Sequence, residues 1–135
     1  MERMIFAGTE ERILDATKWV TRRRGWTHLR AGMMVRPIRQ SLGVQSGSPE
    51  AIIRAPLMIR ETRREPLRRM IDDPAYGERE CILEGYGTDP VLCRPRAFVE
   101  MLCDMYADCT PDSLITRIAF LYTDYDGAKR HATST

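Results

Sequence analysis

The residues with the clearest chemical potential are basic and lie in the first third of the chain. From Arg12 to Arg39, both ends included, there are seven arginines and one lysine, but only one acidic residue, Asp15. Lysine and arginine neutralise phosphates and release counterions from a nucleic acid, so this asymmetry is typical of a phosphate-facing surface. A solvated basic face would have the same composition. A second basic run, 60–69, is interleaved with glutamates and is typical of an ordinary salt-bridged surface.

Arg22, Arg23 and Arg24 form the densest part of the basic segment. Successive side chains on a strand point to opposite faces, so at most two of the three can face one partner. Trp19 and Trp26 flank them, and an indole ring can stack on a base. Packing in a small core is the alternative role for either tryptophan. We therefore predict that any nucleic-acid contact involves these arginines.

A metal site is not expected. The four cysteines, Cys81, Cys93, Cys103 and Cys109, contain no Cys-x-x-Cys pair, and the chain has only two histidines. A structural zinc site is built from closely spaced ligand pairs. We expect reduced cysteines that pack as small hydrophobes, no metal and no other cofactor.

The length of 135 residues fits one domain. Hydrophobic residues make up 43% of the chain but occur in short runs, far below the ~20 residues of a membrane span. The N-terminus has no apolar stretch of signal-peptide length, so we expect no membrane partner and a cytoplasmic location. One domain is predicted at 1–123, followed by a flexible tail at 124–135 that lacks a core pattern.

Capping and periodicity place the candidate residues on a short series of elements. Thr9 can cap a helix that ends near Ala16, and the β-prone residues that follow predict a strand leading into the arginines. The other expected elements are strands at 33–38 and 51–63 (with Pro56 at an edge or a bulge), a loop at 41–49, a helix opened by Pro66, a helix at 96–107 and a strand at 115–122. This mixture predicts an α+β fold, with a small barrel or bent sheet and helices packed over its openings.

Three separated segments resemble ASCH domains of the PUA-like superfamily, particularly those of phage and prophage genomes. The segment 6–23 matches the family core Ile-Leu-x-Gly-x-Lys-x-x-Thr-x-Arg at Ile13, Leu14, Lys18, Thr21 and Arg23, with Ala16 in place of glycine. The segment 82–86 is similar to the family's Glu-Gly-aromatic element, and 98–122 to its closing helix and strand. Met33 departs from the family pattern of Gly-Asp at this turn. The resemblance implies a small PUA-like β-barrel in a bacterium or a phage-infected host cell.

The resemblance also implies a candidate catalytic site. Some small bacterial ASCH proteins are amidohydrolases that remove the acetyl group from N4-acetylcytidine, using a lysine, a threonine three residues later and a distant glutamate. These positions match Lys18, Thr21 and Glu84. A desolvated lysine can take the proton of a threonine hydroxyl, and a glutamate can orient or protonate the leaving amine, without a metal. The structural alternative is a solvated lysine, a strand threonine and a glutamate that caps a turn.

Three functions remain open on this basis. The first is a binding domain for a nucleic acid or modified nucleoside, RNA foremost, with Trp19, Tyr86 and the three arginines (Arg23 above all) as contacts. The second is an amidohydrolase acting on N4-acylated cytidine. The third is a phage accessory protein that binds a host protein, which the poorly matched segments 41–49 and 76–81 keep open.

Overall fold

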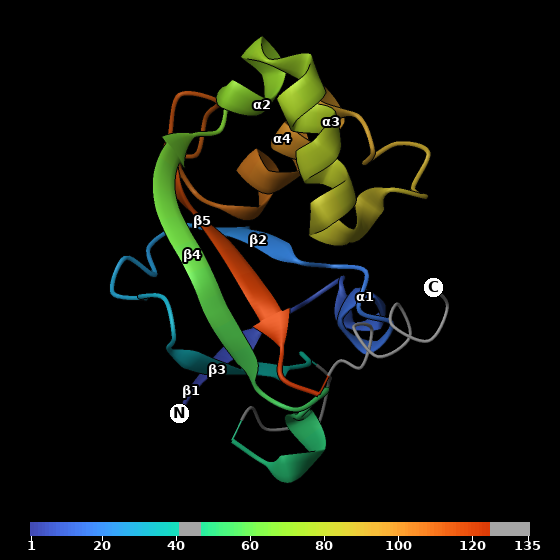
Figure 1. The fold of residues 1–135 in the computed structure, drawn as a ribbon. Coiled ribbons are helices and arrows are strands. Elements are labelled where there is room, and N and C mark those ends of the chain that lie inside the picture. The colour runs from blue at the N-terminus through green and yellow to red at the C-terminus, as the bar shows by residue number, and fades with distance from the viewer. Residues whose placement is uncertain (41–46, 125–135) are drawn as a thin grey trace, which may run out of the picture.

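A computed structural model describes residues 1–40 and 47–124. Its centre is a five-stranded mixed sheet in the order β1-β3-β4-β5-β2 (Figure 1). The strands are β1 (Glu2–Ile5), β2 (Val20–Arg23), β3 (Met34–Ile38), β4 (Leu57–Pro66) and β5 (Leu114–Tyr122). β1 runs parallel to β3, and the other neighbouring strands are antiparallel. The predicted α+β class is confirmed.

The sheet is open, so the expected barrel is wrong for the part of the chain that is described. β1 and β2 are its two edges, and each pairs on one side only, with β3 and β5 respectively. A barrel needs a ladder between its first and last strands together with a matching stagger of all strands. The two edge strands are only four residues long and lie at opposite ends of the strand order.

One face of the sheet carries the main hydrophobic core. Ile118, Phe120 and Tyr122 occupy alternate positions of β5 and are buried there, as the sequence predicts. Phe6 meets Phe120 edge to face, with ring centroids 6.0 Å apart. Ile13 reaches the same core from the short helix α1 (Glu10–Leu14). The core therefore ties the N-terminal segment to the last strand.

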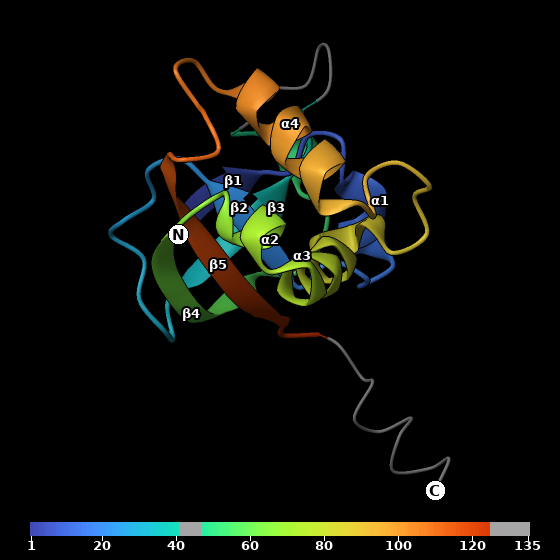
Figure 2. The ribbon, with the colours of Figure 1, turned by 90° about the horizontal axis from the view of Figure 1, so that it is seen from above.

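Three helices gather at one end of β4 and β5, and Figure 2 shows them from above, over the sheet. They are α2 (Arg69–Asp72), α3 (Pro74–Cys81) and α4 (Pro95–Met105). Their second core contains Met70, Tyr76, Phe98 and Leu102. The π-helical segment η2 (Ile82–Tyr86) continues α3 toward the sheet. The helical layer thus brings η2 against the start of β2.

Several predicted boundaries need correction. The strand expected at 51–63 begins only at Leu57, because Pro49–Ala51 form the short 3-10 helix η1 and Pro56 precedes the ladder, to which it has no N–H to donate. Pro66 ends β4 instead of opening a helix. α1 ends before Ala16, whose φ of 59° is left-handed. The expected loop at 41–49 and the tail at 124–135 lie largely outside the described residues.

Candidate functional site

Lys18 and Glu84 meet in the interior. Lys18 Nζ donates to Glu84 Oε1 and to the Glu84 carbonyl oxygen, both at 2.9 Å, and each side chain is 3% exposed. The backbone explains the meeting, because Trp19 N donates to Leu83 O at 2.7 Å and joins the start of β2 to η2. The structure therefore brings together two of the three residues that the ASCH resemblance implies, and it buries them both.

Gly85 is what lets η2 come this close. Its φ of 102° lies in a region that residues with side chains rarely adopt. A Cβ at this position would also lie 3.0 Å from Arg12 Cβ and 3.4 Å from Lys18 Cβ. The Glu-Gly pair of the sequence therefore has a structural explanation. The glycine allows the turn and the close approach of the two segments, and these bring Glu84 within hydrogen-bond distance of Lys18.

Arg22 is the centre of a buried ion network. Its Nη1 donates to Glu84 Oε2 at 2.9 Å, and its Nη2 donates to Glu80 Oε1 at 2.5 Å and lies 3.4 Å from Glu65 Oε2. Arg117 adds a second cation, with Nη2 donating to Glu80 Oε2 at 3.0 Å. Arg22 is only 2% exposed. Its guanidinium group therefore pairs with buried carboxylates and does not lie on the basic surface that the sequence suggested.

Burial and pairing act on the ionisable groups of this network in opposite directions. Burial lowers the pKa of Lys18, and the adjacent Glu84 offsets part of that effect. Burial by itself would raise the pKa of Glu80, but hydrogen bonds from Arg117 and the charge of Arg22 outweigh it and hold this pKa below its ordinary value. The pKa of Glu65 is lowered in the same way, chiefly by Arg63 and Tyr76.

Thr21 does not join Lys18 and Glu84. Alternate residues of β2 face opposite sides, so Thr21 shares its face with Arg23 and not with Arg22. Arg23 Nε donates to Thr21 Oγ1 at 3.1 Å, and the Arg23 guanidinium lies over the Phe6 ring, 4.8 Å from its centroid. The three residues of the implied catalytic set are therefore divided between two environments.

The remaining predicted contacts divide between surface and core. Arg24 is exposed. Trp19 is half-buried and meets Tyr122 edge to face, with centroids 4.9 Å apart. Tyr86 packs against Phe98 in the helical core, with centroids 5.9 Å apart. Trp19 and Tyr86 are thus both half-buried and packed against the two cores, whereas Arg24 lies at the surface.

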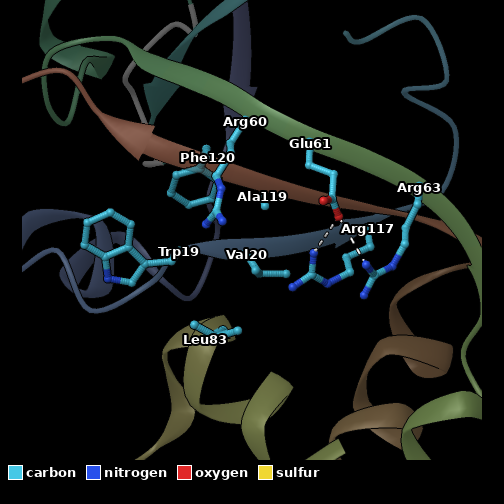
Figure 3. Close-up of a pocket in the computed structure, with 9 residues that line it drawn as sticks. All are labelled: Trp19, Val20, Arg60, Glu61, Arg63, Leu83, Arg117, Ala119 and Phe120. Carbon is cyan, nitrogen blue, oxygen red and sulfur yellow. Dashed lines mark hydrogen bonds and ion pairs between the residues drawn. The ribbon is translucent and has the colours of Figure 1, made fainter. Parts of the chain in front are cut away.

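A cleft of about 430 Å³ opens between the sheet and η2 (Figure 3). Trp19, Val20, Leu83, Ala119 and Phe120 form its apolar lining. The charged part of the lining comes from β4 and β5 and consists of Arg60, Glu61, Arg63 and Arg117. A surface that combines aromatic and aliphatic side chains with guanidinium groups suits a ligand that is planar in one part and anionic in another.

A β-bulge gives the cleft two adjacent charged residues. Ile59 pairs with Phe120 and Glu61 pairs with Ala119, so Arg60 is the extra residue in β4. Without the bulge, Arg60 and Glu61 would point to opposite faces of the strand. Both line the cleft instead, and Figure 3 shows the Arg60 side chain reaching toward Phe120. Sequence reasoning missed this site, because a bulge has no clear signature in the run 60–69.

The charges around the cleft are unequally paired. Glu61 Oε1 lies 3.1 Å from Arg63 Nη1 and 3.5 Å from Arg117 Nη1. Within residues 1–40 and 47–124, the exposed guanidinium of Arg60 forms neither a hydrogen bond nor an ion pair. Along the cleft, the prediction of a salt-bridged surface at 60–69 therefore holds for Arg63 and not for Arg60, whose guanidinium has no carboxylate partner among the described residues.

The described residues contain no group of three or more histidine, cysteine, aspartate or glutamate side chains placed to hold a metal ion. No helix among them has the length and apolar character needed to cross a membrane. No family model, curated protein or solved structure matches this chain.

Proposed function

We propose that this protein is an ASCH-like binding domain for RNA or a modified nucleoside, and that the ligand occupies the cleft between β4, β5, β2 and η2. The observation that carries the proposal is the guanidinium of Arg60, which has no partner among the described residues and lies beside the apolar lining of that cleft. A nucleotide has both matching parts, because its phosphate pairs with arginine and its base stacks on aromatic or aliphatic surface.

Each part of the cleft has a role in this proposal. Arg60 binds a phosphate, since its guanidinium forms no ion pair with any of the described residues. The half-buried ring of Trp19 stacks on the base. The Glu61 carboxylate, 51% exposed, accepts a hydrogen bond from an exocyclic amino group. Arg24, exposed at the end of β2, adds a phosphate contact for a longer strand.

Binding is tested with short single-stranded RNA in a Trp26→Phe background, so that indole fluorescence reports Trp19. Arg60→Ala should weaken binding about tenfold or more, since a charge-assisted hydrogen bond contributes about 1.5–3 kcal/mol. It should also reduce the slope of log affinity against log salt by about 0.7, the value for one phosphate contact on a single strand. The matched control is Arg79→Ala, which removes an exposed arginine of α3 that does not line the cleft.

Two outcomes would overturn this proposal. One is equal binding by Arg60→Ala and Arg79→Ala. The other is RNA or nucleoside binding that leaves the Trp19 emission unchanged. Binding is also measured with cytidine and N4-acetylcytidine as ligands. Affinity for either nucleoside alone indicates a nucleoside site, and affinity for RNA only indicates a site for the polymer.

Lys18 favours the amidohydrolase alternative, because its Nζ lies 2.9 Å from Glu84 Oε1 and its pKa is lowered by burial. Catalysis would also require the Thr21 hydroxyl, which is bonded to Arg23. The assay is chromatographic detection of cytidine after incubation with N4-acetylcytidine, with and without EDTA. A binding domain gives no product. If the wild type forms cytidine and Thr21→Val does not, the protein is an amidohydrolase and not only a binding domain.

A further inference from the structure

Two of the four cysteines face each other where α4 ends. Cys103 lies in the last turn of α4, and Cys109 follows the turn beyond the helix. The two Sγ atoms are 3.6 Å apart, and the Cys109 thiol donates to Cys103. The sulfurs of a disulfide are about 2.05 Å apart. Rotation of the two side chains therefore has to shorten the distance between the Sγ atoms by only about 1.5 Å.

The backbone between them is already reversed. Tyr106 leaves helical geometry with φ −119° and ψ 134°. Asp108 then has a φ of 57°, which is left-handed and uncommon for a residue with a side chain. These two residues turn the chain back on α4 and bring Cys109 to Cys103. The backbone conformation of this turn therefore holds the two cysteines next to each other.

A small reagent can reach this pair. Both thiols are only partly buried. Cys103 also lines a hollow of about 210 Å³ beside Pro111. Cys81, by contrast, is fully buried in the helical core. Accessibility and proximity coincide at Cys103 and Cys109.

We propose that Cys103 and Cys109 are a thiol modification site, at which a low-molecular-weight disulfide such as oxidised glutathione produces an intramolecular disulfide. One cysteine loses its proton and attacks the glutathione disulfide, which gives a mixed disulfide and releases one glutathione. The second cysteine loses its proton and attacks the protein sulfur of that mixed disulfide, which releases the other glutathione. Two protein thiols are oxidised, and one glutathione disulfide is reduced to two thiols.

The surroundings of Cys103 predict how the reaction depends on pH. Burial, with the neighbouring Cys109 thiol as the next cause, raises the pKa of Cys103 to about 11. Only the thiolate attacks a disulfide. The attack by Cys103 should therefore accelerate as the pH rises above neutral, and the bridge should form slowly at neutral pH.

The test treats the full-length protein with oxidised glutathione, then blocks free thiols with iodoacetamide in denaturant and identifies the bridge by non-reducing peptide mass mapping. The free thiol count should fall from the four cysteines of the sequence to two. The bridged peptides should contain Cys103 and Cys109. Amide hydrogen exchange should slow in 104–113 on oxidation, because the bridge fixes the turn against α4.

Cys103→Ser and Cys109→Ser should each abolish the bridge, and the remaining cysteine of the pair should take up at most one glutathione. Cys93→Ser, a matched control at another partly buried cysteine, should form the bridge like the wild type. Circular dichroism confirms that each variant is folded. A stable mixed disulfide on either cysteine in the wild type, or dimers linked through these residues, would overturn the proposal.

Discussion

Lys18 Nζ and Glu84 Oε1 lie 2.9 Å apart, although 66 residues separate them in the chain. The pair is buried, and Glu84 accepts from Arg22 as well. Removing one partner of a buried ion pair leaves an unbalanced charge in a low-dielectric interior. The energetic consequence therefore differs between the two partners, because Lys18 has one carboxylate and Glu84 has two cations.

Glu84→Gln is expected to lower the free energy of unfolding by about 3–5 kcal/mol, because Lys18 loses its carboxylate partner and Arg22 keeps only Glu80 and Glu65. Lys18→Met should lower it by less, since Glu84 keeps Arg22. Urea unfolding measures both changes, with Glu78→Gln on the exposed side of α3 as the control. Equal, small effects of Glu84→Gln and Glu78→Gln would contradict a role for the buried network.

Glu80 is expected to make the stability of the fold sensitive to acid. Its pKa is lower in the folded protein than in the unfolded chain, so its contribution to stability is present above the unfolded pKa and is lost as the pH falls through the folded pKa. The free energy of unfolding should therefore fall from about pH 5 downward, steeply for the wild type and less steeply for Glu80→Gln. Urea unfolding at a series of pH values measures both slopes. Parallel curves would rule out Glu80 as the source.

Gly85→Ala is expected to destabilise the protein by about 1–3 kcal/mol, because a side chain is strained at its positive φ and would crowd Arg12. Gly87 is a matched control two residues away. Its φ of −59° and ψ of −29° suit any residue, and its nearest contact for a Cβ is an ordinary 3.5 Å. Thermal melts compare the two variants. A Gly87→Ala variant that melts as low as Gly85→Ala would refute the backbone argument.

Phe120→Ala is expected to cost about 3–5 kcal/mol, because it removes a buried ring from the centre of the core. Leu121→Ala is the control, since Leu121 is the next residue of β5 and is 36% exposed. Its cost should be well under half of that for Phe120. Thermal or urea unfolding gives both values. If Phe120→Ala were as stable as the wild type, the assignment of β5 to the core would be wrong.

Local patterns in the sequence were enough to find the elements that carry the core. The alternation at Ile118, Phe120 and Tyr122 marks β5, because side chains on a strand alternate between its faces. Pro95 and the apolar spacing after it mark α4, since proline suits the first turn and the apolar stripe repeats with the helix. Such signals depend on neighbours within a few residues, so they are readable without the fold.

Only the tertiary structure shows that the sheet stays open and which partners the charged residues have. The arginine run at 22–24 predicts a basic surface, yet Arg22 lies inside, because carboxylates from β4, α3 and η2 converge on it. The run at 60–69 predicts paired charges, yet a single extra residue in β4 turns Arg60 into the cleft. Sequence determined which residues carry charge and which strands and helices they belong to. Their neighbours come from segments tens of residues away, and only the packing of those segments decided which charges are buried, paired or left for a ligand.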